Sequence, residues 1–109
     1  MNDEAALRAF YADSTSAGAW VSLAFLASYS GYAPAIEPED FDVCPILLTQ
    51  PAQDRWTPLH LSNLFLDRIR KVQVRKTMLD NAGHYPIEQP GLRQMHDAVV
   101  QFARDCSER

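Results

Sequence analysis

The sequence predicts an α/β fold in which a strand, a helix, a second strand and a second helix follow an N-terminal helical region. An apolar run at residues 43–49 is typical of a strand that a parallel sheet covers on both faces, and a second run at 74–79, with Val74, Met78 and Leu79, predicts another strand. Each run leads through a polar loop into apolar residues spaced three and four apart, the pattern of a helix with one buried side. Two strands joined through a helix in this way are expected to lie parallel.

The N-terminal region predicts two helices and a turn-rich connector. Asn2 is placed to cap the first helix, and Ser14 or Ser16 to cap a second helix that ends at Gly31. Residues 34–42 contain two prolines and four acidic side chains, which favour turns over regular structure.

A proline is expected near the start of both the first strand and the helix after it. Pro45 must lie near the beginning of the strand, because proline donates no hydrogen bond to a neighbouring strand. Thr57 is placed as the N-cap of the helix and Pro58 as its first residue. The stripe expected to face the sheet consists of Leu61, Leu64, Phe65, Ile69 and Val72.

The second strand leads through a loop into a last helix that opens at Pro90. Both strands are expected to be buried on both faces. A two-stranded parallel sheet is nevertheless a poor free-standing structure, which indicates that covering structure is missing. The inward face of the last helix is predicted to hold Leu92, Met95, Val99, Phe102 and Cys106.

Composition and charge exclude several classes of protein. The 109 residues carry ten basic and fourteen acidic side chains, whereas a nucleic-acid-binding domain normally has a basic surplus. No apolar run reaches the roughly 18 residues of a membrane span, and the acidic N-terminus is unlike a signal peptide. Cys44 and Cys106 lack metal-ligand spacing and are expected to be free, mostly buried thiols. We therefore expect a small cytoplasmic protein with no metal, no cofactor, no nucleic-acid partner and no membrane span.

Two polar loops follow the carboxyl ends of the predicted strands, where ligands and catalytic groups collect in parallel sheets. One loop carries Asp54 and the other carries His84. A carboxylate that accepts the proton of one imidazole nitrogen leaves the other nitrogen free to act as a base. Each residue could instead have a purely structural role. Asp54 could form an Asx turn that shapes its own loop, and His84 could hydrogen-bond to the backbone. Arg55 and Trp56 flank the acid and could line the mouth of a pocket. The favoured interpretation is structural, with Trp56 packed under the loop.

The two loops with their flanking residues resemble α/β-hydrolase fold enzymes. Residues 44–58 (CPILLTQPAQDRWTP) are similar to the penultimate strand and acid loop of that family. Residues 81–90 (NAGHYPIEQP) are similar to its histidine loop. The resemblance implies that Asp54 is the triad acid and His84 the triad base of a serine hydrolase that acts on esters or related acyl substrates.

The family's nucleophile, a serine in a Gly-x-Ser-x-Gly elbow, does not occur in the sequence. No serine is flanked by that pair of glycines, and the oxyanion donors that the elbow supplies are missing with it. The resemblance therefore implies the C-terminal portion of the fold, with a cap-like helical region and connector at residues 1–42 and a core segment at 43–109. Such a fragment is expected to be inactive alone. Its expected partners are a small acyl substrate and an N-terminal half that carries the serine.

The alternative is a non-enzymatic domain derived from that fold, which associates with itself or with a partner through an exposed sheet edge. Asp54 and His84 are then relics of an enzyme. Under both interpretations, the unpaired outer edge of the strand at residues 43–49 is expected to cause oligomerisation or to leave the fold marginally stable.

Overall fold

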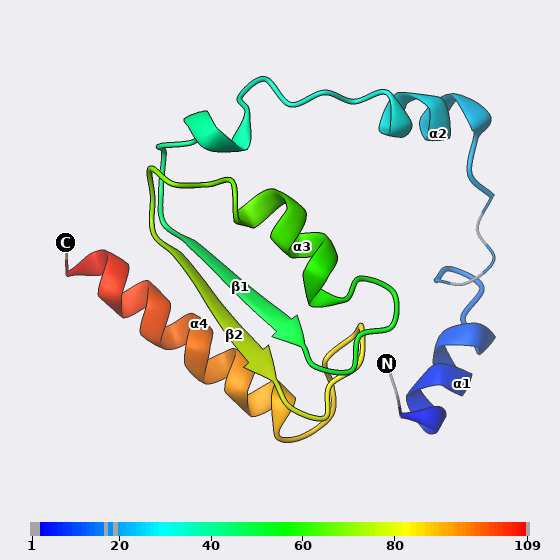
Figure 1. The fold of residues 1–109 in the computed structure, drawn as a ribbon. Helices are drawn as coiled ribbons and strands as arrows, with labels where there is room; N and C mark the ends of the chain where they lie inside the picture. The colour runs from blue at the N-terminus through cyan, green and yellow to red at the C-terminus, as the bar shows by residue number, and fades with distance from the viewer. Residues whose placement is uncertain (1–2, 17, 19, 109) are drawn as a thin grey trace.

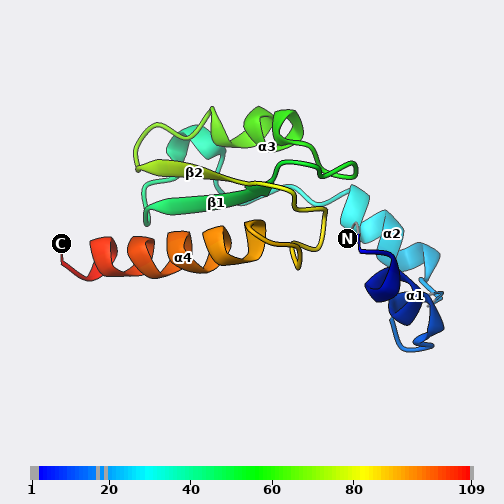
Figure 2. The same cartoon turned by 90° about the horizontal axis from the view of Figure 1, so that it is seen from below.

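The computed structural model describes residues 3–16, 18 and 20–108, which form a two-stranded parallel sheet with helices on both faces (Figure 1). Helix α3 lies over one face of the sheet and helix α4 under the other (Figure 2). None of the helices in the described ranges is long and apolar enough to cross a membrane. In chain order the elements are α1 (Glu4–Ala12), α2 (Leu23–Ser30), the 3-10 helix η1 (Pro38–Asp40), β1 (Ile46–Pro51), α3 (Leu59–Leu66), β2 (Val74–Leu79) and α4 (Gly91–Ser107).

The α/β class and the order strand–helix–strand–helix are confirmed. Strand β2 has the predicted bounds, residues 74–79. Strand β1 runs from Ile46 to Pro51 and so begins and ends later than the predicted residues 43–49. The reason is Pro45, which has no N–H with which to open the hydrogen-bond ladder.

One edge of β1 is paired with β2 and the other is open. Ile46 N donates to Gln73 O, and Ala52 N donates to the last carbonyl of β2, both over 2.9 Å. The alternation of a parallel ladder then turns the N–H groups of Leu47 and Thr49 away from β2. No strand in the described part of the chain pairs with this outer edge.

Two of the three buried apolar residues in the described ranges lie at or just after the carboxyl end of β2, and the third, Ile69, lies in the connection from α3 to β2. Leu79 and Ala82 have no exposed surface, and Ile69 is 7% exposed. Most side chains of β1 are only half-buried, so the expectation of strands buried on both faces is wrong. The strands remain partly exposed because α3, which packs on one face of the sheet, has only eight residues, about two turns of helix.

Helix α3 turns a different side to the sheet from the predicted one. Leu61, Leu64 and Phe65 are 45%, 71% and 49% exposed. Leu59 and Leu66 are half-buried instead. Apolar residues occur on most sides of this helix, so their spacing alone did not determine the side that packs.

Helix α4 also leaves part of its apolar face open. Three residues of the predicted inward face are exposed: Leu92, Val99 and Cys106. Met95 and Phe102 are half-buried. Two strands lie about 5 Å apart, which is less than the roughly 10 Å diameter of a helix, so the sheet cannot cover the whole face. Cys44 is exposed as well, and the expectation of mostly buried thiols is wrong.

Helix α1 begins after Asp3, whose carboxylate caps it. Asp3 Oδ1 accepts a hydrogen bond from Ala6 N over 2.8 Å. The predicted cap, Asn2, lies outside the described residues. The helix lies beyond the carboxyl ends of the strands in both views (Figures 1 and 2).

Helix α2 is shorter than predicted. It begins after Ser22, whose Oγ accepts a hydrogen bond from the backbone of the first turn, and it ends at Gly31 as predicted. Neither Ser14 nor Ser16 caps it. The Ser16 hydroxyl instead donates to Asp13 Oδ2 in the turn after α1, over 2.7 Å.

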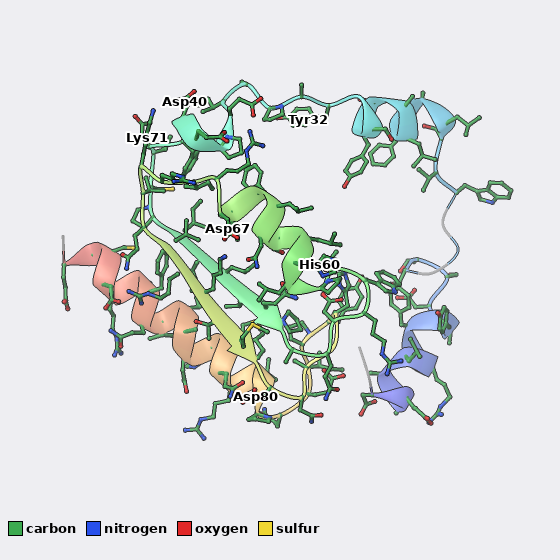
Figure 3. The ribbon with its side chains drawn as sticks, viewed as in Figure 1. Tyr32, Asp40, His60, Asp67, Lys71 and Asp80 are labelled. Atoms are coloured by element: carbon green, nitrogen blue, oxygen red, sulfur yellow. The ribbon has the colours of Figure 1, made fainter. Side chains whose placement is uncertain are left out.

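The acidic connector is tied to the end of α3 by ion pairs. Arg68 Nε and Nη2 contact the carboxylates of Glu39 and Glu37 over 2.6 and 3.0 Å. Lys71 Nζ lies 2.9 Å from Asp40 Oδ1, and the two side chains adjoin in Figure 3. Each exposed pair contributes little by itself, because water screens its charges, but together the pairs hold η1 beside the turn that follows α3.

We predict that Leu79→Ala lowers the free energy of unfolding by about 2–5 kcal/mol, because it opens a cavity in the small core. The same substitution at the 71% exposed Leu64 is the matched control, and we expect it to change stability by less than about 0.5 kcal/mol. Urea denaturation followed by circular dichroism measures both values. Equal losses would contradict the packing of α3 described above.

Candidate functional site

Asp54 lies in the loop after β1, and its buried side chain shapes that loop. The side chain is 3% exposed. Its Oδ1 accepts hydrogen bonds from the backbone N–H of Trp56 over 2.8 Å and of Thr57 over 3.0 Å. This is the Asx-type turn that the sequence offered as a structural alternative.

The second oxygen of the same carboxylate contacts His84. Asp54 Oδ2 lies 3.0 Å from His84 Nδ1 and accepts a hydrogen bond from the Thr57 hydroxyl over 2.8 Å. Thr57 therefore does not cap α3 as predicted, and Pro58 takes the N-cap position without a side-chain bond. The turn and the contact to His84 are both present, one on each oxygen of Asp54.

Two opposing effects set the pKa of Asp54. Burial raises it, because a charged carboxylate is poorly solvated there. Hydrogen bonds from the Thr57 amide, His84, the Thr57 hydroxyl and the Trp56 amide outweigh burial and hold the pKa of Asp54 well below its usual range. The carboxylate is therefore ionised and can only accept, so His84 Nδ1 donates and the lone pair of the neutral ring lies on Nε2.

Gln50, which the sequence did not single out, holds the far end of the acid loop. Its side chain belongs to β1 and the residue is 3% exposed. Its Nε2 donates to Thr57 O over 3.0 Å, and its Oε1 accepts from the Ser62 hydroxyl over 3.5 Å. The signal in the sequence that could have identified Gln50 is a glutamine at the end of an apolar strand, directly followed by a proline.

The histidine loop is fixed to the acid loop and to itself. Gln53 N donates to Ala82 O over 3.0 Å, which joins the two loops directly. Gly83 N donates to Glu88 Oε2 over 3.3 Å. Asn81 has a positive φ of 55°, which asparagine tolerates better than most residues, and its side-chain amide donates to the backbone within the same loop.

The start of α4 supports the histidine loop from below. A Cβ at Gly91 would lie 2.7 Å from the Ala82 Cβ and 2.8 Å from the Asp80 carbonyl oxygen, so only glycine fits. Gln94 of α4 accepts from Asp80 N over 2.7 Å and donates to the Asp80 carboxylate over 2.8 Å. Figure 3 shows Asp80 where β2 ends beside this helix.

His84 faces a cavity of about 260 Å³ through its free side. Its ring lies 4.9 Å from the Trp56 ring and 5.2 Å from the Tyr85 ring, measured between centroids. Nε2 has no hydrogen-bond partner among the described residues. Trp56 is 71% exposed, so it lines this cavity and does not pack under the loop as favoured from the sequence.

Helix α1 supplies the opposite wall of the cavity, which the sequence did not indicate. Leu7, Phe10 and Tyr11 line it from this helix. The Phe10 ring lies 6.1 Å from the Tyr85 ring. Asp3 N also donates to Glu88 Oε1 over 3.1 Å, so Glu88 links the start of α1 to the histidine loop.

The described lining of the cavity contains no serine, threonine or cysteine. Cys44 lies just before β1, at the opposite end of the sheet, and Cys106 lies near the C-terminus of α4. The described residues also hold no group of three side chains that could bind a metal ion. His60 is exposed on α3 (Figure 3), and among the described residues His96 pairs with its neighbour Asp97 alone. The chain thus brings together an acid and a base, and the described lining supplies no nucleophile of those three types.

We predict that Asp54→Asn destabilises the chain by about 1–3 kcal/mol at neutral pH, because it removes a buried charged acceptor. The folded pKa lies below the unfolded value of about 3.9, so this contribution is complete above that value and is lost as the pH falls below it. The difference between wild type and Asp54→Asn should therefore shrink in acid. Thermal unfolding at several pH values measures it, with the exposed Asp97→Asn as control. A difference independent of pH would contradict the bonding of Asp54.

We predict that Gly91→Ala displaces the histidine loop and lowers the free energy of unfolding by about 1–3 kcal/mol, as overpacking does. The added methyl group would meet Ala82 and a backbone carbonyl, neither of which can move freely. Gly31→Ala is the control, because its Cβ would meet one carbonyl oxygen at 3.2 Å. Backbone amide NMR shifts of the loop report the displacement. Unchanged shifts around His84 would refute the close approach.

No family model, curated protein or solved structure matches the chain. What the chain does is therefore inferred from its residues and their geometry. The features available are the buried carboxylate of Asp54, the oriented imidazole of His84 and the cavity beside them.

Proposed function

We propose that the chain is the acid-and-base portion of a serine hydrolase of the α/β-hydrolase type, acting on an ester or related acyl substrate. The observation that carries the proposal is the 3.0 Å contact of His84 Nδ1 with Asp54 Oδ2 at the carboxyl ends of adjacent parallel strands. The resemblance of residues 44–58 and 81–90 to the acid and histidine loops of that family supports it.

In this proposal His84 is the catalytic base and Asp54 its positioning residue. Asp54 holds the Nδ1 proton and so leaves the Nε2 lone pair directed at the substrate side. It also stabilises the imidazolium that forms when Nε2 takes up a proton. Trp56 and Tyr85 restrict the rotation of the ring by contact from two sides.

The nucleophile is a serine hydroxyl supplied from outside the 109 residues. Its proton passes to Nε2 as its oxygen bonds to the acyl carbon. The same proton then passes to the leaving oxygen as the bond from that oxygen to the acyl carbon breaks. Water repeats the two steps on the acyl-enzyme and releases the acid. The chain alone lacks both this serine and the oxyanion donors next to it in the family.

A non-enzymatic association domain is the second candidate, and exposed apolar surface favours it. Leu64 and Phe65 of α3 are 71% and 49% exposed, and they adjoin a sheet with an open edge. Self-association would cover both features without any chemistry at His84. The two candidates differ in whether His84 affects any reaction.

We predict that the purified chain gains no mass on incubation with a fluorophosphonate probe, because it lacks an activated serine. The chain isolated with its bound partners from the cell that makes it is then expected to contain a labelled serine on the partner polypeptide. His84→Ala should reduce the rate of that labelling by about 100-fold or more, the usual effect of a lost general base.

His96→Ala is the matched control, because His96 also contacts an aspartate over 2.9 Å but is 71% exposed. Its labelling should equal that of the wild type. A stoichiometric adduct on the chain alone would place the nucleophile within these residues and contradict the proposal. Isolated complexes without His84-dependent labelling would favour the association domain.

A further inference from the structure

The cavity beside His84 contains a cation, Arg55, for which the described residues supply no partner. Arg55 lines it and carries the only permanent charge among its described lining residues. No described residue forms an ion pair or hydrogen bond with the Arg55 side chain. The neighbouring carboxylate of Asp54 is not available, because its two oxygens are occupied by Trp56, Thr57 and His84.

Among the described residues, six other cations have carboxylate partners, whereas Arg70 and Arg104 have none. Arg68, Lys71, Arg75 and Lys76 all lie within 3.0 Å of an aspartate or glutamate. An unpaired guanidinium at the edge of a cavity, with its planar set of donors, is suited to a carboxylate from a ligand.

Four aromatic side chains form much of the rest of the cavity wall, together with Leu7, Gln53 and the His84 ring. Phe10 and Tyr11 of α1 face it from one side, and Trp56 and Tyr85 from the two loops. An apolar protein cavity of roughly 150 Å³ accommodates benzene. The volume of about 260 Å³ therefore leaves room for an aromatic ring and a short carboxylate arm.

We propose that this cavity binds a small aromatic carboxylate, with its ring among the aromatic side chains and its carboxylate on Arg55. If the ligand is the substrate, the proposal rests on the proposed function, and the substrate is then an acyl ester that also carries such a carboxylate. Binding itself needs neither the serine nor the reaction.

The charge of the ligand follows from Arg55. A set of aromatic rings alone would suit an organic cation through cation–π attraction. A guanidinium in the same wall repels a cation and attracts an anion. One monovalent carboxylate matches the single permanent charge, whereas a phosphate dianion normally takes several donors.

The test compares three probes of similar shape on the full chain: phenylacetate, its neutral analogue phenylacetamide and the cation phenethylammonium. Calorimetry measures affinity, and the assigned NMR signal of the Trp56 indole N–H locates binding. We expect phenylacetate to bind about tenfold more tightly than phenylacetamide, the effect of one charge-assisted hydrogen bond. Phenethylammonium should bind most weakly.

Variants assign the preference to one side chain. Arg55→Gln should weaken phenylacetate binding about tenfold and leave phenylacetamide unchanged. Arg70→Gln is the control, since Arg70 is exposed and lies outside the cavity lining.

Three results would overturn the inference: equal affinity for phenylacetate and phenylacetamide, no probe-induced shift of the Trp56 signal, or a preference unaffected by Arg55→Gln. These outcomes are separate from failure of the proposed function. Carboxylate binding without His84-dependent labelling would leave a ligand-binding domain that performs no hydrolysis. Labelling without carboxylate preference would leave a hydrolase for other substrates.

Discussion

The buried carboxylate of Asp54 is the interaction on which the rest of the site depends. A buried charge without partners costs several kcal/mol, so the groups that satisfy it must be in place when the chain folds. One oxygen orders the amides of Trp56 and Thr57, and the other holds the Thr57 hydroxyl and His84. The turn, the tautomer of the imidazole and the position of the Trp56 ring beside it are therefore consequences of one group.

The best-packed part of the molecule lies directly beneath this group. Leu79 and Ala82, which have no exposed surface, and the close approach at Gly91 are all at the carboxyl end of β2. The outer side of α3 and the open edge of β1 are exposed by contrast. Close packing at this end of the sheet thus fixes the two loops, while the Trp56 side chain beside His84 is itself 71% exposed.

The sequence predicted the elements of the sheet and the pair at its end, because these depend on local signals. The run of apolar residues that becomes β1 and the polar loops around Asp54 and His84 can be recognised from residue order alone. The packing side of α3 was wrong, since apolar residues occur around more than one side of that helix. The predicted face of α4 is buried only in part, at Met95 and Phe102, because the sheet is too narrow to cover the whole face. Gln50 escaped notice because its importance depends on a bond to the distant carbonyl of Thr57.

The division of the chain at residue 42 does not coincide with the boundary of the site. Glu88 joins the start of α1 to the histidine loop, and Phe10 packs against Tyr85. The cavity exists only where this helix meets the two loops, so its aromatic walls come from both parts of the chain. Asp54 and His84 would be oriented without α1, because the bond between them lies wholly within residues 43–109. The N-terminal region therefore helps to determine which ligand can bind beside the imidazole, whereas the core segment determines the orientation and tautomer of the imidazole itself.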